Sequence, residues 1–364
     1  MSLRDEIAGR ILTQGPISLA DYMAEALLHP VHGYYTTRDP LGVRGDFTTA
    51  PEISQMFGEL LGLCLAQAWL DQGAPARVTL AELGPGRGTL MADALRATRA
   101  VPGFHAALEL WLVEASPVLR ARQCAALEGH APRHVGEIAA LPSDRPLYLI
   151  ANEFFDALPI RQFERRAEGW AERLVGLSDG RLAFGLGPEG AQPALAHRLA
   201  DTRPGDLVEV CPAAGPAAAA IGGIIAAQGG AALIIDYGDW RSLGDTFQAL
   251  CQHAPDDPLA NPGQADLTAH VDFEALARAA HPARHSRLTP QGVFLERLGI
   301  SARATALAGR LTGDALAAHV AGHRRLTHPS EMGTLFKVLG LYPPGAAPPP
   351  GLEPQSLEPQ SHDA

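Results

Sequence analysis

The sequence predicts an α/β protein built on a Rossmann-like, mostly parallel sheet. In the segment 78–88, VTLAELGPGRG, an apolar run is followed by three glycines at alternate positions. The helical pattern TLMADALRA comes directly after it, and strand, glycine turn and helix form the first unit of a doubly wound sheet. Further apolar runs at 108–114 and 147–151 are continuous, as expected for parallel strands that are covered on both faces.

Residues 1–75 predict an N-terminal helical cap. Ser18 can cap a helix that stops at Pro30, and a second helix begins near residue 53 after a polar loop. The loop ends in GDFTTAPE, in which Thr49 either caps the second helix or belongs to a lid that closes over a ligand. The candidate lid residues are Asp46, Thr49 and Glu52.

The predicted core, residues 76–341, carries two insertions. The first, about 161–211, alternates polar and apolar residues around an Asp179-Gly180 turn, which predicts an antiparallel hairpin. The second, about 239–272, is rich in polar residues and has little periodicity. A loop of that length in a compact domain is usually functional or disordered.

The core resumes with a predicted helix over 213–228 and an apolar strand that ends at Asp236. Two last strands, near 284–288 and 334–339, would complete the sheet. The tail, 342–364, is rich in proline and glycine and repeats LEPQS, so we expect it to be disordered.

The glycine loop indicates which ligand this sheet binds. A dinucleotide fingerprint needs a third glycine where Thr89 stands, and a phosphate loop needs a lysine that is absent nearby. An acidic residue two places before G-x-G-x-G is instead the pattern of S-adenosyl-L-methionine sites, where the carboxylate meets the methionyl ammonium. The alternative is an ordinary strand-to-helix turn. The predicted cofactor residues of the loop are Glu82, Gly84, Pro85, Gly86 and Gly88.

Acidic residues also follow the next predicted strands. Glu114 ends the strand after the glycine loop, where a carboxylate can bind both ribose hydroxyls in doubly wound folds. Its alternative is a solvated carboxylate at a strand end. Glu137 lies where the following strand should end, and there it could orient the adenine amine.

The segment 150–160, IANEFFDALPI, places polar residues directly after an apolar strand. Asn152, Glu153 and Asp156 would then stand at the carboxyl end of the central strand and are the predicted catalytic residues. Phe154 and Phe155 wall the site or pack in the core. The pair Asp236 and Tyr237 repeats the pattern at the end of a later strand and is assigned to the substrate or lid.

Composition excludes several classes of protein. A chain of 364 residues with 46% hydrophobic and 19% charged residues can bury a sizeable core, as globular enzymes do. Its net charge of −11 disfavours nonspecific nucleic-acid binding and suits cationic partners. No uncharged apolar run reaches the about 18 residues that a membrane span needs.

The cysteines and the N-terminus predict a compartment. The four cysteines form no C-x-x-C pair and suit reduced thiols. The start, MSLRDEIAGRILTQ, resembles neither a secretory signal nor a mitochondrial transit peptide, so we expect a bacterial cytoplasm rather than a mitochondrial matrix. The histidine spacings match no metal motif, and we predict no metal site.

These motifs together resemble the mitochondrial complex I assembly factor 7 (MidA-like, DUF185) family, which are S-adenosylmethionine-dependent protein arginine methyltransferases. The resemblance runs in order from about residue 17 to 339. The matching segments are ISLADYMAEALLHPVHGYY, GDFTTAPEISQMFGELLG, LAELGPGRGTLMADALR, ANEFFDALPIRQF, IDYG, DPLANPGQADLTAHVDF and MGTLFKVL.

The resemblance implies a class I methyltransferase fold, with a seven-stranded sheet, a helical cap and an inserted hairpin. It implies S-adenosyl-L-methionine as cofactor and symmetric dimethylation of an arginine on a subunit of respiratory complex I. The cofactor role falls on Glu82, the three glycines and Glu114, and the substrate role on Asn152, Glu153 and Asp156. The run around Phe247 departs from the family's more basic pattern, so no substrate contact is carried over there.

Two other functions stay open at this point. The chain could be a non-catalytic assembly chaperone, although intact motifs at the glycine loop and at ANEFF argue against that. It could also methylate a small molecule or a nucleic acid, although the acidic balance and the absence of N-P-P-[FY] at Asn152 disfavour nucleic acid. The expected partner is a protein with an exposed arginine, and the oligomeric state is open, with a homodimer as one option.

Overall fold

The computed structural model describes residues 2–37, 49–251 and 254–355. The chain divides into two compact units, each assembled from three stretches. The sheet unit comprises Ala50–Asn152, Ala217–Asp236 and Leu276–Ala364. The hairpin unit comprises Met1–Thr49, Glu153–Pro216 and Tyr237–Ala275. This division differs from the predicted boundaries at 75 and 341, because the first 49 residues group with the two insertions.

The sheet unit is built on one path of strands in the order β15-β17-β10-β5-β2-β3-β4. Strands β10, β5, β2, β3 and β4 pair in parallel, whereas β15 and β16 pair antiparallel to β17. The bounds are β2 (Val78–Leu83), β3 (Leu108–Val113), β4 (Arg133–Val135), β5 (Leu147–Asn152), β10 (Gly230–Asp239), β15 (Arg284–His285), β16 (Thr289–Pro290) and β17 (Phe336–Tyr342). The predicted mostly parallel α/β sheet is confirmed; over the described residues it has nine strands rather than seven, because the two-residue strands β14 and β16 pair with β10 and β17 beside the main path.

Two glycines let helices α5 (Gln55–Asp71) and α6 (Thr89–Thr98) pack at close range. A Cβ at Gly58 would lie 2.7 Å from the carbonyl oxygen of Leu90, and one at Gly62 would lie 2.7 Å from Ala94. Both distances are below van der Waals contact, so neither position accepts a larger residue without a shift of α6. Since α6 follows the glycine loop directly, this contact also fixes where the loop stands.

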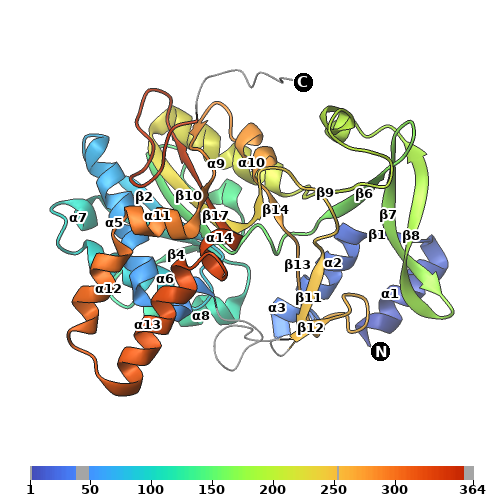
Figure 1. Ribbon diagram of the computed structural model, residues 1–364, viewed down its shortest axis with the longest axis horizontal. Coiled ribbons are helices and arrows are strands. Elements are labelled where there is room, and N and C mark those ends of the chain that lie inside the picture. The colour runs from blue at the N-terminus through green and yellow to red at the C-terminus, as the bar shows by residue number, and fades with distance from the viewer. Residues whose placement is uncertain (1, 38–48, 252–253, 356–364) are drawn as a thin grey trace. The chain divides into compact units, whose positions relative to one another are not determined.

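The other helices belong partly to the sheet unit and partly to the hairpin unit. In Figure 1, α12 and α13 form an adjacent pair toward the C-terminal part of the chain. The bounds are α1 (Leu3–Gln14), α2 (Leu19–Leu28), α3 (Tyr34–Thr37), α4 (Ala50–Ile53), α7 (Phe104–Ala107), α8 (Pro117–Ala126), α9 (Ala214–Gln228), α10 (Phe273–Ala279), α11 (Gln291–Arg297), α12 (Ile300–Ala308), α13 (Gly313–Thr327) and α14 (Met332–Leu335), with 3-10 turns at Ile138–Ala140 and Pro193–Leu199.

The hairpin unit contains two antiparallel sheets. One has the order β1-β7-β6-β9 with β8 paired to β7, and the other has the order β12-β11-β13. The predicted Asp179-Gly180 turn joins β7 to β8, with both residues at positive φ, 49° and 73°. The bounds are β1 (Ile17–Ser18), β6 (Arg161–Arg165), β7 (Trp170–Ser178), β8 (Arg181–Gly190), β9 (Leu207–Val210), β11 (Gln248–Cys251), β12 (Ala254–Asp256), β13 (Asp266–Thr268) and β14 (Val271–Asp272).

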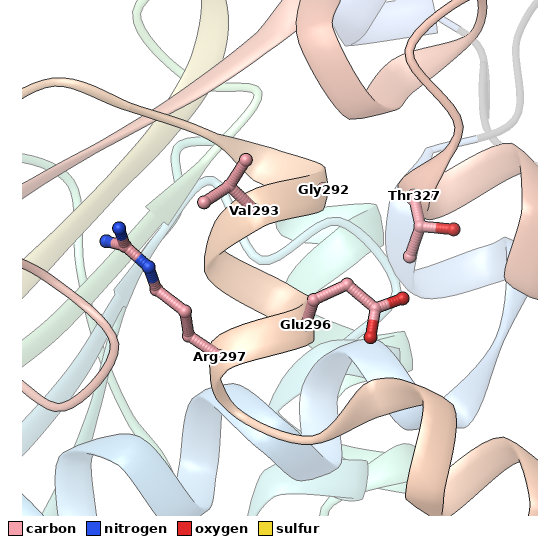
Figure 2. A pocket seen from close by; sticks show the side chains of 5 residues that line it. All are labelled: Gly292, Val293, Glu296, Arg297 and Thr327. Atoms are coloured by element: carbon pink, nitrogen blue, oxygen red, sulfur yellow. The ribbon is translucent and has the colours of Figure 1, made fainter.

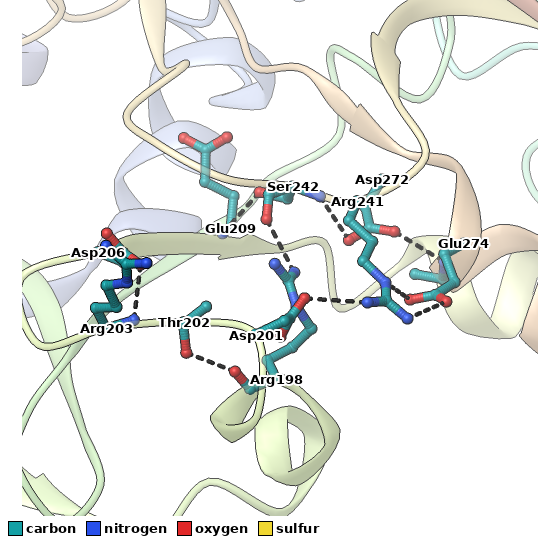
Figure 3. Close-up of polar contacts among 11 residues, drawn as sticks. Arg198, Asp201, Thr202, Arg203, Asp206, Glu209, Arg241, Ser242, Asp272 and Glu274 are labelled. Atoms are coloured by element: carbon teal, nitrogen blue, oxygen red, sulfur yellow. Dashed lines mark hydrogen bonds and ion pairs between the residues drawn. The ribbon is translucent and has the colours of Figure 1, made fainter. Parts of the chain in front are cut away.

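A polar network within the hairpin unit holds the chain that follows β10 (Figure 3). Arg241 binds Glu274 through two hydrogen bonds of 2.8 and 2.9 Å. Arg198 donates to the carbonyl of Ser242 at 2.8 Å, and the amide of Ser242 donates to Asp272 at 3.0 Å. These hydrogen bonds therefore hold the backbone after β10 in a defined position.

Three segments differ from their sequence-based expectation. The stretch 239–272, expected to be loop-rich, holds β11, β12, β13 and β14, which are too short to show a period of two in the sequence. Helices α11 to α13 were not predicted. The tail, expected to be disordered from residue 342, packs as far as 355: Leu352 is buried and Pro350 accepts a hydrogen bond from Cys64 at 3.4 Å.

Neither a membrane-spanning helix nor a metal-binding cluster occurs among the described residues. Among the helices in residues 2–37, 49–251 and 254–355, none combines the length and apolar character that crossing a bilayer demands. The same residues contain no cluster of histidine, cysteine, aspartate or glutamate side chains arranged to hold a metal ion. The four cysteines form no disulfide.

Candidate cofactor site

The carboxyl ends of the parallel strands in the sheet unit are level with one another. Ligands of doubly wound sheets bind at this edge. The predicted residues Gly84, Glu114 and Asp236 each follow a strand residue of this aligned row, and Asn152 belongs to it. The aligned pairs are Leu83 with Val113, Val113 with Val135, Leu83 with Ala151, and Ile235 with Asn152.

The glycine loop requires its glycines. Gly84, Gly86 and Gly88 all have positive φ, at 56°, 53° and 85°. A residue with a Cβ would cost roughly 1–2 kcal/mol at each such position. The amide of Gly88 donates to the carbonyl of Pro85 at 2.8 Å and closes the turn just before α6. The loop therefore presents main chain, with no Cβ at any of the three glycines, at the edge of the sheet.

Glu82 stands at the end of β2 with only 3% of its surface exposed. Its Oε2 atom is buried and makes no hydrogen bond within the described residues. Burial raises the pKa of this carboxyl to about 8. A buried carboxylate without a partner is costly unless a ligand supplies the missing donor, so this position suits a cationic group such as an ammonium.

Glu114 follows β3 and belongs to a hydrogen-bonded network. Its Oε1 accepts from the amide of Ser116 at 2.7 Å, and its Oε2 accepts from the side chain of Gln123 at 3.2 Å. Gln123 also donates to the carbonyl of Gly86 at 2.8 Å. Burial raises the pKa of Glu114 above its ordinary value. Sequence reasoning missed Gln123, because a glutamine inside a helical pattern carries no signal of its own.

Of the three candidate lid residues, the structure describes Thr49 and Glu52. Asp46 lies outside the described residues, and Thr49 lies directly before α4. Glu52, on α4, accepts a hydrogen bond of 2.6 Å from the hydroxyl of Thr89 and lies 3.8 Å from the guanidinium of Arg87. Glu52 therefore braces the start of α6 and the glycine loop within the sheet unit.

The other predicted residues of the sheet unit differ in exposure. Asp236 is fully buried and Asn152 is 8% exposed. Glu137 is exposed and lies two residues after β4, before a 3-10 turn. Glu137 is therefore exposed to solvent, whereas Glu82 is buried. The assignment of Glu137 to the adenine stays a prediction.

The second stretch of the hairpin unit begins at Glu153, which has a strained backbone conformation. Glu153, directly after the last residue of β5, has a φ of 50°. Left-handed backbone at a non-glycine residue costs roughly 1–3 kcal/mol, and strain of this kind is a known feature of active sites. Such a conformation turns the chain sharply at the first carboxylate of the ANEFFD segment.

Asp156 lies in a buried cluster within the hairpin unit. It is 6% exposed, and burial raises the pKa of its carboxyl to about 6, against a hydrogen bond with Tyr237 that lowers it. The ring of Tyr237 meets the ring of His270 edge-on at 5.3 Å. Nearby, Tyr35 donates to Asp266 at 2.7 Å; burial, followed by the charges of Asp266 and Asp156, raises the pKa of Tyr35. Tyr35, Asp266 and His270 were not among the predicted site residues.

A separate pocket in the sheet unit does not involve these residues. It has a volume of about 480 Å³ and lies beside α11 (Figure 2). The lining residues are Gly292, Val293, Glu296, Arg297 and Thr327. None of them is a predicted site residue, and the pocket plays no part in the assignments below.

Comparisons with known proteins agree on one family. A family model described as "Putative S-adenosyl-L-methionine-dependent methyltransferase" matches residues 60–291. The chain is 30% identical to a Burkholderia thailandensis protein whose crystal structure contains S-adenosyl-homocysteine. The two structures superpose with a TM-score of 0.80, over 93% of this chain and 91% of that one.

Curated relatives match over most of the chain. "Protein arginine methyltransferase NDUFAF7, mitochondrial" of Xenopus tropicalis is 37% identical over 94% of this chain and 86% of the relative. The Homo sapiens protein of the same name is 38% identical over 92% of this chain and 82% of the relative. Because these relatives are named as mitochondrial, the prediction of a bacterial cytoplasm, made from the N-terminal residues alone, is wrong.

Proposed function

The chain belongs to the S-adenosyl-L-methionine-dependent methyltransferase family whose model matches residues 60–291, and from this premise we propose that it methylates arginine side chains of a protein. The fold and the cofactor, S-adenosyl-L-methionine, follow from the family and agree with the sequence-based prediction. The observation that supports an arginine acceptor is the 37–38% identity, across nearly the whole chain, to relatives named protein arginine methyltransferases.

The residues of the sheet unit fit this cofactor. Glu82 offers a buried carboxylate oxygen with no hydrogen bond from the described residues, which suits the methionyl ammonium. Gly84, Gly86 and Gly88 leave the main chain accessible, and Glu114 can accept hydrogen bonds from the ribose hydroxyls. When bound, S-adenosyl-L-methionine supplies a methyl group on a positively charged sulfonium.

An arginine acceptor creates an electrostatic problem that carboxylates can solve. The guanidinium stays protonated at neutral pH. Holding it about 4 Å from a second cation costs on the order of 4 kcal/mol at an effective dielectric near 20. We assign Glu153 and Asp156 to offset this repulsion, because carboxylates bind guanidinium groups bidentately and localise their charge. One nitrogen would then keep a lone pair for the methyl group, S-adenosyl-homocysteine would be the leaving group, and one of the two carboxylates would accept the proton that the nitrogen loses.

The proposed target is a subunit of respiratory complex I, the substrate that the resemblance implies. The proposed product is symmetric dimethylarginine. Asn152 is assigned to orient the acceptor, with Asp236 and Glu52 as supporting residues. Positioning of this kind can supply roughly 7–11 kcal/mol of the barrier reduction in a displacement between two held groups.

A labelling experiment tests the function directly. The purified chain is incubated with methyl-labelled S-adenosyl-L-methionine and a cell lysate, and label is counted separately in protein, RNA and small molecules. We expect label in protein, and symmetric dimethylarginine after acid hydrolysis and mass spectrometry. Label only among small molecules contradicts the proposal. Absence of any heat on calorimetric titration with the cofactor supports a non-catalytic chaperone instead.

The rate of methyl transfer should depend on the ionisation of Asp156. Because burial raises the pKa of Asp156 to about 6, the carboxylate is charged above that pH and neutral below it. We expect kcat/KM to fall about tenfold per pH unit below pH 6. Tyr237→Phe removes a hydrogen bond that lowers this pKa, so its profile should break at a higher pH. A wild-type profile that is flat from pH 5 to 7 would remove Asp156 from the mechanism.

A further inference from the structure

We propose that Gln123 is a positioning residue of the cofactor site, which ties the ribose-binding carboxylate of Glu114 to the glycine loop. The inference rests on the proposed role of Glu114 toward the ribose. It concerns one buried amide on α8 that contacts both the glycine loop and Glu114, and it explains why a polar side chain occupies a fully buried position.

The geometry of Gln123 is fixed on three sides. Its Nε2 donates to the carbonyl of Gly86 at 2.8 Å and to Oε2 of Glu114 at 3.2 Å. Its Oε1 lies 2.9 Å from Nε2 of His134, on β4. The residue has no exposed surface. A buried amide normally has all of its hydrogen-bonding atoms satisfied, and these contacts supply the partners.

The chemistry of the partners decides which way the amide points. A carbonyl can only accept, so the NH₂ group of Gln123 must face Gly86 and Glu114. The amide oxygen then faces His134, whose Nε2 must carry the hydrogen. Burial and the nearby Arg120 lower the pKa of His134, which keeps the ring neutral, with its single N–H directed at Gln123.

The result is a carboxylate that is oriented before any ligand arrives. Glu114 accepts hydrogen bonds from the amide of Ser116, from the side chain of Gln123 and from the amide of Ala115. An ionised carboxylate has about four lone-pair positions, so it still has room to accept from a ribose hydroxyl. Because Gln123 also holds Gly86, the carboxylate and the loop keep a fixed spacing, which lowers the ordering cost of binding.

A purely structural role makes a different prediction from a positioning role. If Gln123 only supports the fold, its replacement weakens every cofactor analogue equally. If it acts through Glu114, the loss falls on ligands that carry ribose hydroxyls. The comparison of two ligands therefore separates the two roles without reference to turnover.

The test is calorimetric titration of the full chain with S-adenosyl-homocysteine and with its 2′,3′-dideoxy analogue. Gln123→Leu conserves approximate size and removes both donors. We expect its Kd for S-adenosyl-homocysteine to rise roughly 10- to 100-fold, as for loss of a hydrogen bond to a charged group. The Kd for the dideoxy analogue should rise less, so that the preference for the hydroxylated ligand collapses. In Glu114→Gln, adding Gln123→Leu should change this preference no further.

Matched variants complete the design. His134→Gln keeps an N–H donor toward Gln123 and should retain the ribose preference, whereas His134→Phe should lose part of it. Cys124→Ala, at the exposed neighbouring position on α8, should bind both ligands as the wild type does. Equal loss of both ligands in Gln123→Leu, or an unchanged preference, overturns the inference. If the wild type binds neither ligand, the cofactor assignment itself fails.

Discussion

Glu153→Gln is expected to stop methyl transfer while leaving the affinity for S-adenosyl-L-methionine unchanged. The substitution preserves size and removes the charge that we assign to the acceptor guanidinium. Removal of one pre-positioned electrostatic group costs roughly 10²- to 10³-fold in kcat. The measurement is the initial rate with labelled cofactor, together with a calorimetric Kd for S-adenosyl-homocysteine. Full activity in this variant would exclude Glu153 from the reaction.

The strained backbone at Glu153 offers a matched control. Glycine accepts a φ of 50° without penalty, so Glu153→Gly should raise the free energy of unfolding by about 0.5–1 kcal/mol while abolishing activity. Gain of stability with loss of function would identify strain that is maintained for catalysis. If Glu153→Gly is less stable than the wild type, the left-handed conformation is not a cost at this position.

Glu82→Gln is expected to weaken cofactor binding by roughly 10- to 150-fold at pH 8, the loss for a charge-assisted hydrogen bond in a buried site. The effect should depend on pH. With a pKa of about 8 in the free chain, Glu82 is neutral at pH 7, and an arriving ammonium favours its ionised form. In the wild type, binding should therefore release close to one proton from Glu82. In Glu82→Gln, residue 82 has no proton to release. Titrations in two buffers of different ionisation heat measure this.

The same carboxyl should also shape stability without any ligand. The pKa of Glu82 is raised in the folded chain, from 4.5 to about 8. Between these values the unfolded chain is ionised and the folded chain is protonated, so folding stability falls as pH rises, by up to about 1.4 kcal/mol per unit. Below pH 4.5 and above pH 8 the slope should vanish. Urea unfolding of wild type and Glu82→Gln should therefore diverge between pH 5 and 8, and parallel curves would contradict the raised pKa.

Sequence patterns predicted the sheet because its strands are continuous apolar runs that end in polar residues. The end of β2 at Leu83, the start of α6 after Gly88 and the capping of α2 by Ser18 all agree with the structure. These features depend on neighbours in the sequence. Since parallel strands share one edge, the alignment of Glu114 and Asn152 with the glycine loop could also be anticipated.

Features that depend on distant contacts could not be predicted. Gln123 is distinguished from other glutamines only by its distances to Gly86 and Glu114. The role of Glu52 depends on the hydroxyl of Thr89, the residue that breaks the dinucleotide fingerprint. Likewise, Gly58 and Gly62 look like weak points in a helix until α6 is seen to lie against them. Local patterns contain no information about such partners.

The division of the hairpin unit into three stretches has a consequence for synthesis on the ribosome. The core that contains Ile7 and Leu19 also contains Val175 and Leu267. At about 5–20 residues per second, the roughly 250 residues between Leu19 and Leu267 take about 12–50 s to emerge. Helices α1 and α2 must therefore wait, with apolar side chains uncovered, for the last of their packing partners. These two helices are made early and buried late, so their apolar faces stay open to nonspecific association during synthesis.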